Sequence, residues 1–173
     1  IEQLESIDFS LLDLLDRKEE EIRKGIISPI SALSVQEIAS LEDQYRKLGL
    51  EAIQSGKIGA VLLAGGQGSR LGFEHPKGML NIGESKELFL FEQLITNLLH
   101  VVKQANAWIP LLIMTSSINH EETVDFFHDH DFFGYQSSYI RFFRQEMAPA
   151  TDFSGKIYLE NKGQVSLSPN GNG

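Results

Sequence analysis

The spacing of apolar and polar residues predicts a helical region at the start of the chain. Residues 4–24 have a helical composition with regular apolar anchors, and Pro29 lies beyond them. Ser34 followed by Glu37 matches a capping box, in which the hydroxyl accepts a hydrogen bond from a free amide while the carboxylate reaches back. Apolar residues then recur at helical spacing, so we predict one helix over residues 35–54.

Short apolar runs and amphipathic stretches alternate in the middle of the chain. The first two apolar runs have the character of strands that are buried on both faces. The expected elements are a strand over 58–64, a helix over 88–106, a strand over 109–115, a helix capped by Asn119 that ends near 130, and a strand over 139–144. Strands that alternate with helices are typical of a parallel sheet with crossover helices.

The last part of the chain has a different pattern. Ile157 and Leu159 alternate with polar residues, as do Val165 and Leu167, and the turn residues 161–163 lie between the two pairs. Alternation with a period of two predicts a β-hairpin with one buried face.

Residues 63–79, LAGGQGSRLGFEHPKGM, contain the clearest indication of a ligand site. A strand that runs into Gly65, Gly66 and Gly68 lets the backbone approach a ligand closely, because no Cβ stands in the way. Amides exposed in such a turn form a concave site for anions.

Two cations accompany these glycines. Arg70 and Lys77 can gather around phosphate oxygens, and Pro76 fixes the backbone immediately before Lys77. The pattern therefore indicates the binding of a nucleoside triphosphate, with stabilisation of the charge that develops during phosphoryl-type transfer.

Other interpretations of the glycine-rich turn differ in how well they fit. A P-loop is excluded because no glycine precedes Lys-Ser or Lys-Thr. The spacing Gly66-x-Gly68-x-x-x-Gly72 is similar to a dinucleotide fingerprint, but the second strand ends in residues 115–117, Thr-Ser-Ser, where such a site needs an acid. A glycine-rich turn that binds no ligand is the third alternative, and it leaves Arg70 and Lys77 unexplained.

Composition narrows the class of protein. The 173 residues carry a formal net charge of -9, which argues against a nucleic-acid-binding surface. There are no cysteines, and no apolar run is long enough to span a bilayer. We therefore expect a cytoplasmic protein with no membrane partner. His128 and His130 do not form a metal site, since residues two apart on a helix point to nearly opposite sides.

Several motifs together resemble the UTP-dependent sugar-1-phosphate uridylyltransferases, and within them most closely the UDP-N-acetylglucosamine pyrophosphorylase branch. The resemblance rests on LAGGQGSRLG at 63–72 and Pro-Lys-Gly at 76–78. It also rests on IMTS at 113–116, FFRQEMAPA at 142–150 and the terminal SLSPNGNG. The family resemblance implies a Rossmann-like, doubly wound α/β sheet of the nucleotidyltransferase (glycosyltransferase-A-like) type.

The same resemblance implies a reaction and its residues. A uridylyl group would pass from UTP to a sugar 1-phosphate, most simply N-acetylglucosamine 1-phosphate, with release of pyrophosphate. Arg70 and Lys77 would be catalytic, and Mg²⁺ would bridge phosphate oxygens. The nucleotide-binding residues would be Leu63, Ala64, Gly65, Gly66, Gln145 and Gly171, and Asn172 would contact the sugar. Gln145 can read uracil because an amide carries both a donor and an acceptor.

Alternatives to this function stay open. Glucose 1-phosphate or galactose 1-phosphate could be the acceptor, and a non-catalytic module that binds UTP or a UDP-sugar is the alternative from another class. Asn170 stands where family members commonly have Asp, and the metal ligands of the family lie downstream of this chain. We expect a helical N-terminal segment, 1–56, followed by the first part of a nucleotide-binding catalytic domain, 57–173. Alone, these residues are expected to be inactive.

Overall fold

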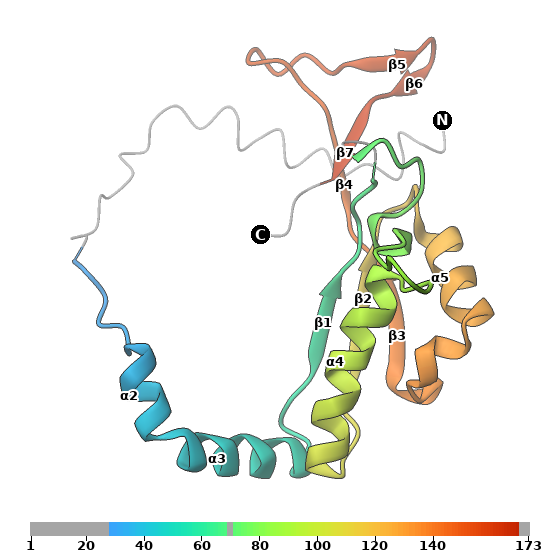
Figure 1. Cartoon of the computed structure of the whole chain (residues 1–173). Coiled ribbons are helices and arrows are strands. Elements are labelled where there is room, and N and C mark those ends of the chain that lie inside the picture. Colours follow the sequence, from blue (N-terminus) through green and yellow to red (C-terminus); the bar gives the residue numbers. More distant parts are fainter. Residues whose placement is uncertain (1–27, 69–70, 170–173) are drawn as a thin grey trace. The chain divides into compact units, whose positions relative to one another are not determined.

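The computed structural model describes residues 28–68 and 71–169 (Figure 1). The helix expected over 4–24 lies outside these ranges. The described chain divides into two compact units. One is Gln36–Gln145, and the other contains the described residues on either side of it.

The larger unit is built on a parallel sheet of three strands in the order β1-β2-β3 (Figure 1). Its elements are β1 (Ala60–Leu63), α4 (Leu90–Ala105), β2 (Leu111–Thr115), α5 (His120–Asp129) and β3 (Ile140–Arg144). The predicted alternation of strands and helices, and with it the parallel α/β sheet, is confirmed. The carboxyl ends of all three strands therefore meet at one edge of the sheet, where ligands bind in open α/β folds.

Helix α4 shows why the sequence places its ends where it does. The carboxylate of Glu92 accepts a hydrogen bond from the backbone N–H of Phe89, 3.4 Å away, and so satisfies one free donor at the start. At the other end Asn106 adopts a left-handed conformation with φ 50°, which stops the helix. Between them, Phe91 and Ile95 are buried against the sheet.

Met114 is buried on one face of the described sheet, but most of the core lies on the other face. Leu111 and Ile113 of β2 pack there with Ile140 of β3 and Phe127 of α5. Burying these apolar side chains against both crossover helices supplies the main stabilisation of the unit.

The opposite face of the sheet corrects one prediction. We expected the first strand to be buried on both faces, but the side chains of Val61 and Leu63 are 58% and 52% exposed. The strand register places Leu112 and Phe143 on the same face, and they are exposed as well. The reason is that the two helices that cover the sheet within Gln36–Gln145 pack on the other face, and β1 is an edge strand of the described sheet.

The helix expected over 35–54 is interrupted. The structure has α2 (Val35–Ser40) and α3 (Glu42–Gln54), separated at Leu41, whose φ of -114° and ψ of 12° are not helical. The hydroxyl of Ser40 donates to the carbonyl of Glu37 at 2.7 Å, and such back-bonding weakens a helix locally.

The smaller unit contains two antiparallel pairs. Strand β4 (Met147–Pro149) pairs with β7 (Leu167–Pro169), and β5 (Leu159–Asn161) pairs with β6 (Gln164–Val165). The hairpin predicted around 161–163 is therefore confirmed. Its single buried face is not, because Val165 is 5% exposed whereas Leu159 is 61% exposed. Leu167 leaves the hairpin and pairs with Pro149, so the apolar positions do not line one continuous face.

Candidate functional site

The glycine-rich turn after β1 folds back on the Pro-Lys-Gly segment. The backbone N–H of Gly68 donates to the carbonyl of His75 at 3.0 Å, and that of Lys77 donates to the carbonyl of Gly66 at 3.2 Å. The residues between these two hydrogen bonds pair as an antiparallel bridge. This arrangement, called the turn ladder below, fixes the backbone of Lys77 beside Gly66 at the carboxyl edge of the sheet.

The turn ladder is held to the sheet through Ala64. Its N–H donates to the carbonyl of Met114 in β2 at 2.7 Å, and its carbonyl accepts from the Asn119 side chain at 2.9 Å. Asn119 precedes α5, as predicted, but its side chain makes no capping hydrogen bond to the helix. Its Oδ1 accepts instead from the backbone and hydroxyl of Ser116, so the fully buried Asn119 joins the β2–α5 turn to the glycine-rich turn.

Gln145 and Gly65, two residues predicted to bind the nucleotide, lie together. The N–H of Gln145 donates to the carbonyl of Thr115 at 2.7 Å, which continues the pairing of β2 and β3. A Cβ added to Gly65 would lie 2.8 Å from Nε2 of Gln145. The Gln145 carboxamide therefore occupies the space that a side chain at position 65 would fill. Because residue 65 is glycine, this carboxamide can lie there, and it can hydrogen-bond to a base.

A pocket of about 210 Å³ lies between the turn ladder and the start of α4. Lys77 and the backbone of the turn form one side, and apolar side chains of α4 form the other. The residues that line it are Leu62, Leu63, Ala64, Gly66, Lys77, Gly78, Leu90, Phe91 and Leu94. The structure therefore brings Leu63, Ala64, Gly66 and Lys77 of the predicted set together around one cavity, whereas Arg70, Gly171 and Asn172 lie outside the described residues.

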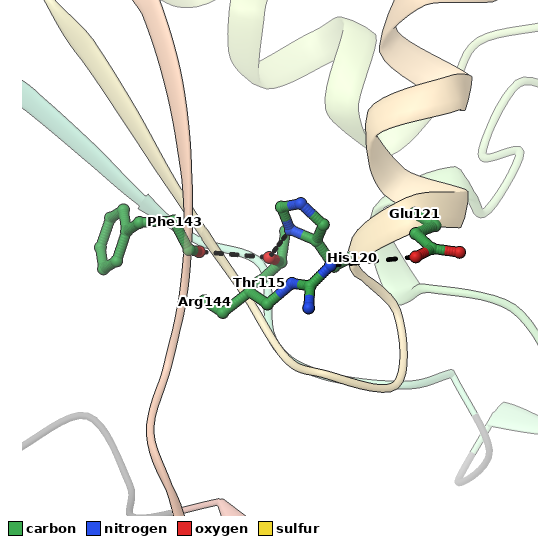
Figure 2. Close-up of polar contacts among 5 residues, drawn as sticks. All are labelled: Thr115, His120, Glu121, Phe143 and Arg144. Carbon is green, nitrogen blue, oxygen red and sulfur yellow. Dashed lines mark hydrogen bonds and ion pairs between the residues drawn. The ribbon is translucent and has the colours of Figure 1, made fainter. Parts of the chain in front are cut away.

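A second polar cluster at this edge of the sheet was missed by the sequence reasoning (Figure 2). The buried hydroxyl of Thr115 donates to the carbonyl of Phe143 at 3.2 Å and lies 2.7 Å from Nδ1 of His120. A hydroxyl has one proton and a carbonyl can only accept, so Nδ1 of His120 is the donor to Thr115. Arg144 and Glu121 lie beside this cluster, with their charged atoms 3.9 Å apart. The sequence signal available for this cluster was a threonine at the end of a predicted strand, five residues before a histidine.

A family model described as UTP–glucose-1-phosphate uridylyltransferase matches residues 9–173. The chain belongs to this family. It is 38% identical over 154 residues to the UDP-N-acetylglucosamine pyrophosphorylase of Saccharomyces cerevisiae, which covers 85% of this chain and 32% of that protein. The resemblance inferred from the motifs is therefore confirmed.

Solved structures support the fold of this uridylyltransferase-family chain. The UDP-N-acetylglucosamine pyrophosphorylase of Trypanosoma brucei, solved with an inhibitor, has a TM-score of 0.71 and 33% identity over 79% of this chain and 29% of its own. A putative UDP-N-acetylglucosamine pyrophosphorylase from Entamoeba histolytica has a TM-score of 0.74 and 35% identity over 84% of this chain and 38% of its own. The α/β nucleotidyltransferase-like fold is confirmed. The chain spans about a third of the length of its relatives.

In the ranges that the structure describes, 28–68 and 71–169, no three His, Asp or Glu side chains form a group that could hold a metal ion. In the same ranges, no helix has the length and the apolar character needed to cross a membrane.

Gly78 gives a prediction about stability. Its Cα faces the buried ring of Phe91, and an added Cβ would lie 2.1 Å from that ring. Because both groups are buried, we expect Gly78→Ala to lower the free energy of unfolding by about 1–3 kcal/mol. Urea denaturation measures this change. Gly66→Ala is the matched control for stability, since a Cβ there meets no described atom within 4 Å; equal losses for the two variants would contradict the prediction.

Thr115 gives a second prediction about stability. Thr115→Val keeps the shape of the side chain but removes the hydroxyl that hydrogen-bonds to His120 Nδ1 and to the Phe143 carbonyl. We expect the free energy of unfolding to fall by about 0.5–1.5 kcal/mol, the net contribution of a typical hydrogen bond, because His120 is half-buried and Phe143 is exposed. Thermal or urea unfolding measures it. Thr115→Ser retains the hydroxyl and should lose less; an equally stable Thr115→Val variant would count against the assigned hydrogen bonds.

Proposed function

We propose that the complete protein transfers a uridylyl group from UTP to N-acetylglucosamine 1-phosphate and releases pyrophosphate. The observation that carries this proposal is the turn ladder, which holds the backbone of Lys77 beside Gly66 at the carboxyl edge of the sheet. The names of three relatives, which all contain UDP-N-acetylglucosamine pyrophosphorylase or diphosphorylase, support this choice of acceptor.

In the proposed reaction, a phosphate oxygen of the sugar 1-phosphate attacks the α-phosphorus of UTP. The bond from that phosphorus to the bridging oxygen breaks, and pyrophosphate leaves with the electron pair. The displacement needs no protein nucleophile, so the contribution of the chain is positioning and stabilisation of charge. The ammonium group of Lys77 would neutralise charge on the triphosphate, and we propose that the guanidinium group of Arg70 does the same.

Recognition of the base would depend on Gln145. Its carboxamide lies over Gly65, where it can donate to a carbonyl oxygen of uracil and accept from the ring N–H. We propose that Leu63, Ala64 and Gly66 border the uridine, and that Gly171 and Asn172 contact the nucleotide and the sugar. Mg²⁺, when bound, would draw charge from the phosphate oxygens, with protein ligands from beyond this chain.

A pyrophosphate-release assay on the complete protein tests the function. UTP would be supplied with the 1-phosphates of N-acetylglucosamine, glucose and galactose in separate reactions. We expect the highest kcat/KM with N-acetylglucosamine 1-phosphate. A preference for glucose or galactose 1-phosphate would correct the acceptor. If UTP binds but no acceptor yields pyrophosphate, the complete protein is a nucleotide-binding module, and the enzymatic proposal fails.

We infer a cytoplasmic location for this protein, with UTP and a sugar 1-phosphate as its small-molecule partners. The acidic charge of -9 and the absence of cysteine support this inference. Fractionation of cells that express the complete protein checks it, and recovery in a membrane fraction would contradict it.

A further inference from the structure

The side chain of His75 connects the turn ladder to helix α5. Its Nδ1 lies 2.5 Å from Oε1 of Glu122, in the first turn of that helix. The two residues are 47 positions apart in the sequence, so the contact is tertiary. It joins the loop that carries Lys77 to a neighbouring crossover helix.

Glu122 lies on a part of α5 that is firmly packed. The adjacent Thr123 and, one turn further, Phe127 are fully buried beneath α5. Asn119, just before the helix, hydrogen-bonds to Ala64 at the base of the glycine-rich turn. The carboxylate therefore projects from a part of the helix that the core and the turn already hold in place.

His75 also stands in the turn ladder, two residues before Lys77. Its backbone carbonyl accepts from Gly68, while the N–H of Lys77 donates to Gly66. Pro76 between them is buried and has a φ of -50°, fixed by its ring. Because Pro76 is rigid, restricting the motion of His75 also restricts the motion of the Lys77 backbone.

We propose that His75 and Glu122 are positioning residues that hold Lys77 in place through the turn ladder. The proposal deepens the function proposed above and rests on it where turnover is concerned. The pair is partly exposed, with side-chain exposures of 59% for His75 and 42% for Glu122. A hydrogen bond between two partly exposed side chains is a modest restraint, so each effect is expected to be about twofold to fivefold.

Hydrogen exchange tests the restraint without any need for activity. In the complete protein, Glu122→Gln is compared with Glu121→Gln, which removes the same charge from the same helical turn but from a carboxylate that lies against Arg144 rather than His75. We expect the amides of Gly68 and Lys77 to exchange about twofold to fivefold faster in Glu122→Gln only. Equal exchange in the two variants would overturn the proposal.

Kinetics test whether the restraint acts through Lys77. His75→Ala should lower kcat about twofold to fivefold, and His75→Lys should restore it by supplying another hydrogen-bond donor for Glu122. In a Lys77→Ala background, His75→Ala should cause no further loss, because the group that it positions is absent. Fully additive losses would indicate a general structural defect and overturn the proposal. If the wild-type protein releases no pyrophosphate, the proposed function fails, and hydrogen exchange still decides the restraint.

Discussion

Replacing Lys77 by alanine is expected to lower the kcat of the complete protein by about 10² or more. Lys77 lines the pocket, and the turn ladder fixes its backbone beside Gly66. Its ammonium group would stabilise the charge that develops on the phosphate oxygens in the transition state. Removing this group should therefore destabilise the transition state most. Initial rates of pyrophosphate release at saturating UTP and sugar 1-phosphate give kcat, and titration of each substrate gives KM.

The control for this substitution is Lys57→Ala. Lys57 is also exposed, but it precedes β1 and so lies at the amino end of the sheet, away from the turn ladder. It should leave kcat unchanged. A kcat for Lys77→Ala within twofold of wild type would remove this residue from the catalytic role.

Replacing Gln145 by glutamate is expected to lower kcat/KM for UTP by about 10-fold to 100-fold and to reduce the preference for UTP over CTP. A carboxylate can only accept hydrogen bonds, so it would face an acceptor oxygen of uracil but could accept from the amino group of cytosine. Losing one hydrogen bond and leaving polar groups unpaired costs about 1–3 kcal/mol. Parallel assays with UTP and CTP measure both changes.

Gln136→Glu is the matched control for this experiment. Gln136 is an exposed glutamine whose side chain donates to Ser138, and it lies before β3 rather than after it. The same change of charge there should leave the UTP/CTP ratio as it is in wild type. If Gln145→Glu keeps the wild-type ratio, the base is read by other groups.

Local patterns predicted most elements of the larger unit, because each apolar run or amphipathic stretch is long enough to identify itself. They failed where contacts with other segments of the chain determine the local structure or its burial. Val61 and Leu63 match a strand buried on both faces, yet only the contacts of the whole sheet determine that one face stays exposed. Leu41 continues the apolar spacing of a helix, and its non-helical backbone could not be inferred from that spacing.

The candidate site divides in the same way. The glycines, Lys77 and Gln145 could be selected from sequence because their residue types suit phosphate and uracil. The contacts that hold them could not, since they join distant segments. Asn119 suggested a helix cap, but its side chain reaches Ala64. His75 suggested only a residue at the rim of the pocket, and its bond to Glu122 depends on where α5 packs. Gly78 is needed because Phe91 fills the space above it.

The position of the triphosphate tests the account most directly. A crystal structure of the complete protein with UTP and Mg²⁺ would locate it. We predict phosphate oxygens within hydrogen-bonding distance of backbone amides of the glycine-rich turn and of Nζ of Lys77, with uracil against the carboxamide of Gln145. A triphosphate bound elsewhere, with the turn and Lys77 free of contact, would contradict the account.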